Sequence, residues 1–396
     1  MRFDTTLYYH VGDDYSWPLL FEEMRETVEL VDELGYTGLW LAEHHFAWDG
    51  WYRSGSNPLM LGAEVARWSD RLRMGQCGLV LPDWHPIRLA EDISFLDNMT
   101  KGRVDIGIAP GINSRACTQF HLAADRQDRE TNRRLYEENA QIIIKVLENE
   151  SFAHQGEFWT FPATEWRETN PHGLDRRFHR ADGTLEKLGI SPGPYQKPRP
   201  NMWAMSESVS SAEFCARNRI GTMSQSLSLG RIGQNWRRYQ EIASKTRGYE
   251  VGFGEGLAIM RNTFVAPSME EALAAARPGY RRLFSWASDS PLHKRSNSVL
   301  PEEFDPAFDK QDWLDFQINI DSALVGTPES VTAQVQRLAD FGCTHLALFL
   351  NIPGLSFEQV KNSLRLFATE VIPNIQSPKT GSSDASANSG HVQETY

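Results

Sequence analysis

Histidine and acidic side chains follow three predicted strands in the first quarter of this chain. His10 ends "RFDTTLYYH", Glu43-His44-His45 ends "GLWLAEHH", and Asp83-Trp84-His85 follows "LRMGQCGLVLP". Imidazole has an ordinary pKa close to neutral pH, so these positions suit general acid/base chemistry. One histidine at a strand end is usually a hydrogen-bonded structural residue, but three such ends beneath one mouth favour a functional site.

The Glu43-His44-His45 stretch predicts two different roles for its histidines. Successive side chains of a strand point to opposite faces, so Glu43 and His45 should share one face and His44 should take the other. We therefore expect one imidazole to act as the general acid or base, while the neighbouring carboxylate holds the other in place.

A metal site is the obvious rival interpretation, because imidazoles and carboxylates bind Zn²⁺ or Mn²⁺. A metal-dependent barrel hydrolase would need His10, His44 and His85 to converge on one ion. Such enzymes usually carry a His-x-His pair on the first strand, and this chain has only His10 there. The sequence therefore predicts no metal.

Two further motifs suit ligand binding but also have ordinary structural explanations. Cys77-Gly78 places small residues inside a strand, which marks either the close approach of a backbone or ligand, or a bulge. The serines of "MSESVSSAEF" precede a helix, where they cap it or form an anion site. Phosphate binding there would require a nearby cation such as Arg133 or Arg134.

Strand and helix patterns alternate along most of the chain and predict an α/β fold. Helical periodicity at 19–35, 57–69, 87–100, 130–149, 210–219, 230–248, 268–286, 328–342 and 356–375 separates short apolar runs typical of buried strands. About eight strands alternating with helices predict a (β/α)8 TIM barrel. A doubly wound open sheet is the alternative, but no Gly-x-Gly-x-x-Gly turn follows the first strand.

Two segments interrupt this alternation. Residues 151–200 and 287–320 lack a clear period and are predicted to be excursions from the barrel, and the aromatic residues of the second could form a lid over the mouth. The small polar residues at 377–396 predict a disordered C-terminal tail. We therefore expect a single barrel domain over residues 1–376.

Charge and cysteine spacing limit the partners and the compartment. The formal net charge is −12, and nucleic-acid or anionic membrane binding needs clustered Lys and Arg, so neither partner is predicted. The four cysteines lack the close spacing of zinc or redox motifs. With neither a signal peptide nor a run of about 18 apolar residues, a cytoplasmic location is expected.

Four motifs together resemble the bacterial luciferase-like flavin-dependent monooxygenases. They are "GYTGLWLAEHHF", "GLVLPDWHPIRLAEDISFLDNMTKGRVDIGIAPG", "ESVSSAEFCA" and "VGTPESVTAQVQRLADFG" with the later "LFATEVIPNI". They occur in the family's order up to about residue 375. The resemblance implies a barrel with excursions, with reduced FMN at its C-terminal mouth. It also implies reaction with O₂ at the flavin C4a position and transfer of one oxygen atom to an organic substrate.

The resemblance also assigns roles to individual residues. His44 corresponds to the catalytic acid/base, and Cys77-Gly78 to a non-proline cis peptide under the flavin ring. The remaining implied flavin contacts are Glu43 and Asn113, together with the phosphate contacts Glu207, Ser208, Ser211 and Arg133. The implied substrate pocket contains His10, His45, Trp48 and Trp51. Ala109-Pro110 stands where the light-emitting subunit has a Cys-Arg pair, which argues against bioluminescence on a long-chain aldehyde.

The expected partners are a separate NAD(P)H:flavin reductase, a small hydrophobic substrate such as a ketone, aldehyde or terpenoid, and a second copy of the chain in a homodimer. Three alternatives remain open. The same cleft could serve an F420-dependent hydride-transfer oxidoreductase, the chain could be a flavin-binding subunit without chemistry, or it could be the metal-dependent hydrolase.

Overall fold

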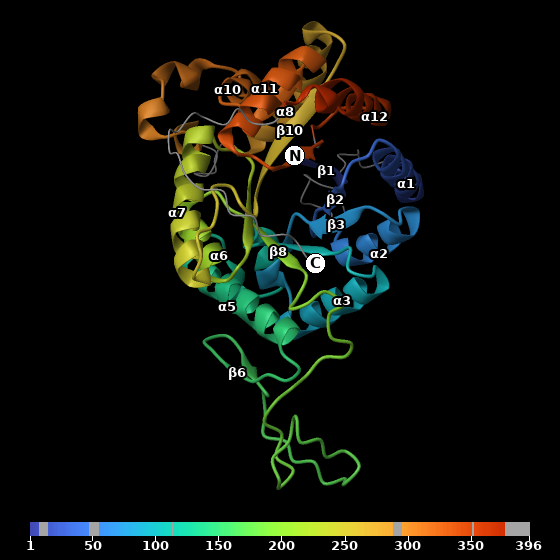
Figure 1. The fold of residues 1–396 in the computed structure, drawn as a ribbon, viewed down its shortest axis with the longest axis vertical. Coiled ribbons are helices and arrows are strands. Elements are labelled where there is room, and N and C mark those ends of the chain that lie inside the picture. The colour runs from blue at the N-terminus through green and yellow to red at the C-terminus, as the bar shows by residue number, and fades with distance from the viewer. Residues whose placement is uncertain (8–14, 47–54, 113, 288–294, 351, 377–396) are drawn as a thin grey trace, which may run out of the picture.

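A parallel sheet rolled into a barrel forms the centre of the molecule (Figure 1). The computed structural model describes residues 1–7, 15–46, 55–112, 114–287, 295–350 and 352–376. The strands are β1 (Arg2–Leu7), β2 (Gly38–Leu41), β3 (Arg73–Gln76), β4 (Leu79–Val80), β5 (Asp105–Ala109), β6 (His154–Gln155), β7 (Thr160–Phe161), β8 (Asn201–Met205), β9 (Gly221–Ser224), β10 (Leu257–Val265), β11 (Ala323–Gly326) and β12 (His345–Phe349).

Helices surround the sheet, and the longer ones bury apolar side chains. They are α1 (Trp17–Glu33), α2 (Pro58–Trp68), α3 (Pro86–Met99), α4 (Ser114–Cys117), α5 (Arg129–Glu148), α6 (Val209–Arg217), α7 (Leu229–Arg247), α8 (Met269–Ala287), α9 (Arg295–Ser298), α10 (Trp313–Asn319), α11 (Pro328–Phe341) and α12 (Phe357–Leu366). In α1, for example, Leu20, Met24, Val28 and Val31 lie on one stripe and are all buried. Among the residues described here, no helix is long and apolar enough to span a membrane.

The strand order confirms the barrel and excludes the open sheet. Neighbouring strands run β3-β2-β1-β12-β10-β9-β8-β5-β4, and all of these pairs are parallel. The two ends of this order, β3 and β4, are consecutive in the chain, and a bridge from Met74 to Val104 joins β3 to the start of β5. The single strand predicted over residues 72–82 is thus split into β3 and β4. The strand β11, which the sequence did not predict, pairs with β10.

A buried tryptophan fills the barrel interior and requires glycine on the neighbouring strands. Trp40 is 2% exposed, and a methyl group added at Gly75 would lie 2.5 Å from its ring. A methyl group at Gly107 would lie 1.6 Å from the Gln76 carbonyl oxygen. Close packing of β3 and β5 around the indole therefore depends on residues without a β-carbon.

A buried ionic network closes the amino-terminal end of the barrel. The Asp4 carboxylate accepts hydrogen bonds from the indole nitrogen of Trp40 at 3.0 Å and pairs with His345 Nε2 and with Arg2, both at 2.7 Å. Burial alone would raise the pKa of Asp4, but the hydrogen bond and charge of His345, together with Arg2, hold that pKa below its usual range. This end of a barrel commonly serves stability.

The two predicted excursions are present and differ in character. Residues 151–200 extend away from the body below α5 and contain the short hairpin of β6 and β7 together with isolated β-bridges (Figure 1). The described part of the second excursion forms its own cluster, in which Phe304, Phe308 and Trp313 pack against the buried Phe316 and its neighbours. These aromatic residues therefore serve local packing, and the structure does not test a role as a lid.

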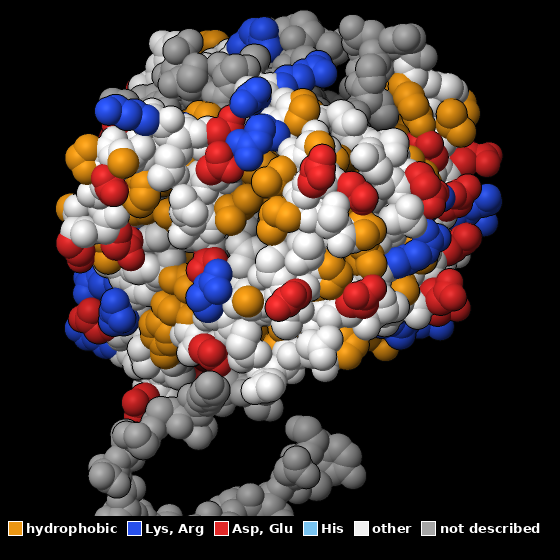
Figure 2. Space-filling view, turned by 90° about the horizontal axis from the view of Figure 1, so that it is seen from above, with side chains coloured by type: hydrophobic (Ala, Val, Ile, Leu, Met, Phe, Trp, Pro, Cys, Tyr) orange, Lys and Arg blue, Asp and Glu red, His pale blue; other side chains and the backbone are white. Residues whose placement is uncertain are grey.

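Acidic and basic side chains alternate on the face seen in Figure 2. Neither sign dominates this face. A nucleic-acid footprint would gather basic side chains into one patch or stripe, so this face does not resemble one.

The glycine requirement of the barrel gives a direct test. We expect Gly107→Ala to lower the free energy of unfolding by at least about 3 kcal/mol, because the new methyl group must separate β5 from β3. Urea unfolding would measure the loss. Gly233→Ala in α7 is the matched control, since its methyl group meets atoms only at 3.4–3.5 Å. Gly233→Ala should leave the free energy of unfolding unchanged or raise it slightly. A Gly107→Ala variant as stable as the wild type would contradict this packing.

Candidate active site

The predicted functional residues lie where the parallel strands end. Glu43, His44 and His45 follow β2, Cys77-Gly78 lies between β3 and β4, and Glu207-Ser208 follows β8. Because all barrel strands run in parallel, these ends meet at the same mouth. The fold therefore gathers segments that are more than 150 residues apart in sequence.

The carboxylate of Glu43 has several hydrogen-bond partners at this mouth. It is 3% exposed and accepts hydrogen bonds from the Val80 backbone N–H at 3.0 Å and from the Trp84 indole N–H at 2.9 and 3.0 Å. His45 Nε2 lies 2.7 Å from Glu43 Oε1, so the prediction that these two residues share a face is confirmed. Glu43 thus joins the end of β2 to β4 and to the turn that follows it.

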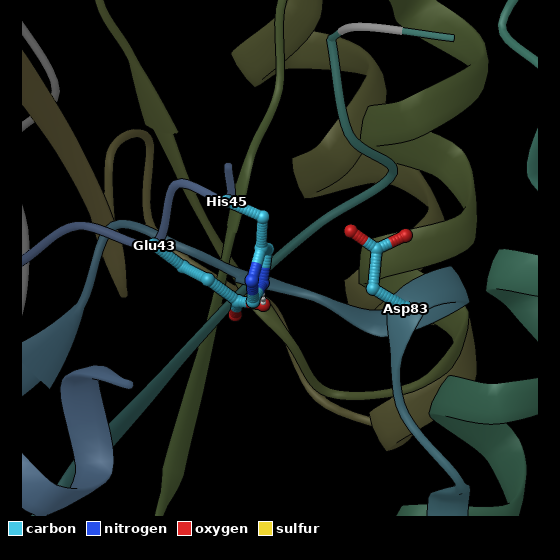
Figure 3. Close-up of side chains that lie close together, drawn as sticks. All are labelled: Glu43, His45 and Asp83. Carbon is cyan, nitrogen blue, oxygen red and sulfur yellow. Dashed lines mark hydrogen bonds and ion pairs between the residues drawn. The ribbon is translucent and has the colours of Figure 1, made fainter. Parts of the chain in front are cut away.

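Asp83 is a second carboxyl group beside this pair (Figure 3). It ends the short 3-10 turn η2 (Leu81–Asp83). Side-chain nitrogen and oxygen atoms of Glu43, His45 and Asp83 all lie within 4.8 Å of one another. Burial and the neighbouring charge of Glu43 raise the pKa of Asp83 to about 7, while His45 and a hydrogen bond with Cys117 act in the opposite direction. Burial also raises the pKa of Glu43, which its hydrogen bonds oppose.

This cluster suits hydrogen bonding better than metal binding. Both oxygens of Glu43 already accept hydrogen bonds from N–H donors, and His45 Nε2 contacts the carboxylate directly. A metal ion would have to displace those donors to reach the same lone pairs. His85, part of the metal alternative, instead caps α3 by accepting a hydrogen bond from the Arg88 backbone N–H at 3.5 Å, and its ring packs against Trp159.

His44 lies between two anchored neighbours. The side chains of Glu43 and His45 bond to each other, and the ring of His45 also packs edge-on against Phe120 with centroids 4.6 Å apart. The backbone N–H of His44 donates to the carbonyl of Gly55 at 3.2 Å. The main chain that carries the half-buried His44 is therefore held from both sides.

The peptide between Cys77 and Gly78 is cis, as the family resemblance implied. Cys77 packs with Trp40, Met223 and Met260 in the barrel interior. Although the residue keeps some exposed surface, burial raises the pKa of the Cys77 thiol to about 12, so the thiol stays protonated. A methyl group at Gly78 would lie 2.9 Å from the main chain of Ile108, so only glycine fits between β4 and β5.

The predicted phosphate contacts lie near the starts of two neighbouring helices. Ser208 is the N-cap of α6 and accepts a hydrogen bond from the Ser211 N–H at 3.2 Å. Arg133 lies in the second turn of α5, and the rings of Tyr136 and Phe214, 6.0 Å apart, bring α5 and α6 together. Arg133 pairs with Glu130 and Glu137 of its own helix, so the structure does not yet join it to Ser208.

Glu207 bonds to the main chain of a neighbouring loop. Its carboxylate accepts hydrogen bonds from the backbone N–H groups of Gln225 at 2.6 Å and Ser226 at 3.3 Å. It therefore ties the end of β8 to the loop after β9. A carboxylate satisfied in this way shapes the rim of the mouth, and phosphate contact by Glu207 remains a prediction.

Four other predicted residues, His10, Trp48, Trp51 and Asn113, lie outside the described residues. Conversely, the sequence did not identify Trp84 and Val80 as partners of Glu43. Trp84 stood beside two candidate residues in the sequence, but its indole N–H could bond to many acceptors. Only the path of β4 decides that it reaches Glu43.

Comparison with known proteins agrees with this geometry. Residues 1–345 match the family model for luciferase-like monooxygenases. The chain belongs to this family and is therefore an enzyme of the flavin-dependent monooxygenase class.

Individual relatives are more distant. The chain is 26% identical to the oxygenase component of flavin-dependent trigonelline monooxygenase from Acinetobacter baylyi, over 96% of this chain and 97% of that protein. Its fold matches the oxygenating constituent of 3,6-diketocamphane monooxygenase from Pseudomonas putida, a type II Baeyer-Villiger monooxygenase in complex with FMN, with a TM-score of 0.71, 19% identity and coverage of 96% and 100%.

An F420-dependent secondary alcohol dehydrogenase also shares the fold, with a TM-score of 0.65, 14% identity and coverage of 95% and 100%. The barrel alone therefore does not separate flavin from deazaflavin chemistry.

Proposed function

We propose that this protein is the oxygenase component of a two-component system, which uses reduced FMN and O₂ to place one oxygen atom into a small hydrophobic substrate. A separate NAD(P)H:flavin reductase supplies the reduced flavin. The observation that supports this most is the position of His44. Its main chain is anchored by Glu43 and His45, and it lies at the barrel mouth beside the break between β3 and β4.

The residues at the mouth fit a flavin. Cys77 and Gly78 are small residues at this mouth, and the barrel interior beside them is lined by the apolar side chains around Trp40 and Met260. The start of α6, with Ser208 and Ser211, offers hydroxyl and backbone N–H groups to a phosphate. Reduced FMN bound there would supply the electrons for oxygen activation.

His44 is the proposed acid/base of the reaction. A neutral imidazole near pH 7 can accept a proton from a reacting group and return it in a later step. The anchored neighbours of His44 limit the motion of its main chain, which keeps the proton transfer distance short. The apolar interior excludes water, which protects reactive species from unproductive breakdown.

His44→Ala tests this role. We expect flavin affinity to stay within severalfold and oxygenated product to fall by roughly 10²–10⁴, the usual contribution of an acid/base group. The amount of oxygenated product should be measured with FMNH₂ that any reductase supplies. The candidate substrates are ketones, aldehydes, terpenoids and trigonelline, and a parallel assay replaces FMNH₂ by F420H₂. The exposed His172→Ala is the control. Unchanged product from His44→Ala would refute the role, and turnover with F420H₂ alone would favour the hydride-transfer alternative.

Ser208→Ala tests the phosphate end of the site. We expect FMN to bind about tenfold more weakly, the loss of roughly one hydrogen bond to a charged group, while riboflavin affinity stays unchanged. Fluorescence titration with both flavins would measure the difference. Ser228→Ala, which removes the N-cap of α7, controls for the loss of capping alone. Equal loss of affinity for FMN and for riboflavin would argue against a phosphate contact. The same titration of Arg133→Gln with both flavins tests the predicted contact of Arg133.

We also propose a homodimer that buries the outer face of α3. Phe95 and Met99 lie one turn apart on this helix and are 59% and 57% exposed. Phe95→Glu should shift the protein to monomer in analytical ultracentrifugation, because a charge would replace buried apolar area. Phe21→Glu on α1, at a phenylalanine that is 45% exposed, is the control. A wild-type monomer, or a dimer that persists in Phe95→Glu, would contradict this interface.

A further inference from the structure

The two carboxyl groups behind the mouth, Glu43 and Asp83, have unequal surroundings. Glu43 receives two N–H donors, from Val80 and Trp84, and has His45 Nε2 as a third polar partner at 2.7 Å. All three can donate, and donors favour the ionised form of a carboxyl group. Glu43 is therefore the carboxylate of the two.

Asp83 receives much less support for a negative charge. Its Oδ1 atom is buried and has no hydrogen-bond partner among the residues that the structure describes. Within the described part of the chain, the donor to its carboxyl group is the thiol of Cys117, and a thiol is a weak donor. An oxygen that is buried without a donor is a costly place for a negative charge, so a proton is favoured there.

The short distance between the groups strengthens this inequality. Side-chain nitrogen and oxygen atoms of Glu43, His45 and Asp83 lie within 4.8 Å of one another, and Figure 3 shows Asp83 beside the Glu43–His45 pair. Two carboxylates so close in a buried place repel each other, and one of them keeps a proton. The donors on Glu43 decide that the proton stays on Asp83.

We propose that Glu43 and Asp83 form an unequal carboxyl pair, with Glu43 ionised and Asp83 protonated, and that this pair positions His45 and through it the main chain of His44. In this arrangement His45 Nε2 keeps its hydrogen and donates it to Glu43. Both carboxyl groups are positioning residues, since they act through His45. The catalytic consequence rests on the proposed function, whereas the protonation states do not.

Several titratable groups face Asp83 and bear on its proton. Glu43 and His45 approach from the end of β2, and Cys117 approaches from α4. Arg126 is close enough to Cys117 for a charge interaction. Burial and Glu43 raise the pKa of Asp83 to about 7 against the opposing effects of His45 and Cys117. Ionisation of Asp83 above that pH would place a second charge beside Glu43 and favour the imidazolium form of His45.

The first experiment needs no flavin. The pKa of Asp83 is raised in the folded state, so its contribution to stability is present at low pH and is lost as pH rises from about 4 to about 7. Asp83→Asn abolishes this dependence. Between pH 6 and pH 8, the unfolding equilibrium constant of the wild type should rise about tenfold relative to that of Asp83→Asn.

Denaturant unfolding of both proteins at the two pH values measures this ratio. Asp70→Asn, at an exposed aspartate in the loop after α2, is the matched control and should show no such change relative to the wild type. Carbon-13 NMR of wild-type protein labelled at aspartate carboxyl carbons provides a measurement that needs no folded variant. One resonance should titrate near pH 7. A constant ratio, or aspartate resonances that all titrate in the ordinary acidic range, would overturn the pair.

The second experiment follows product per oxidised flavin from pH 6 to pH 9. The wild type should lose coupling as pH passes 7, Asp83→Asn should keep it, and Glu43→Gln should lose it at every pH because a carboxamide is a poorer acceptor for the donors around it. Parallel pH profiles for wild type and Asp83→Asn would refute the positioning role. If the unfolding ratio behaves as expected but no substrate is oxygenated at any pH, the pair stands and the proposed function fails.

Discussion

The carboxylate of Glu43 joins three parts of the barrel mouth that the main-chain hydrogen bonds of the sheet leave apart. β3 pairs with β2, but β4 pairs with β5, so the sheet has no ladder between β2 and β4. At this point the Val80 N–H donates to the side chain of Glu43. The same carboxylate holds Trp84 and His45, so one buried group links these segments by side-chain hydrogen bonds.

This arrangement connects stability with function. The mouth of a barrel needs strand ends that diverge enough to admit a ligand, yet buried backbone groups must keep hydrogen-bond partners. Glu43 satisfies the Val80 N–H of β4 at the point where β3 and β4 separate. At the opposite end, Asp4 organises Trp40, His345 and Arg2 into a closed floor. Each end of the barrel is thus organised around one buried carboxylate, and the two have different surroundings.

The position of His44 follows from these constraints. Glu43 and His45 follow β2, and their side chains bond to each other on either side of His44 in the chain. The main chain at His44 is also bonded to Gly55. These hydrogen bonds fix the main chain at His44, the proposed acid/base residue, through its neighbours.

Much of this protein could be determined from the sequence alone. Alternating strand and helix periods indicated the barrel, the motif around Glu43-His44-His45 indicated the family, and strand alternation placed Glu43 beside His45. These are local properties, set by side-chain periodicity and by residues adjacent in the chain.

Only the tertiary structure decided that one predicted strand divides into β3 and β4, that Trp84 and Val80 bond to Glu43, and that Asp83 lies beside Glu43 and His45. Those outcomes depend on distances between segments about 40 residues apart, and no local pattern encodes which donor reaches a buried carboxylate. The contrast between the two carboxyl groups is likewise a property of packing, because burial and neighbouring charge set the pKa of a side chain that is chemically ordinary in the sequence.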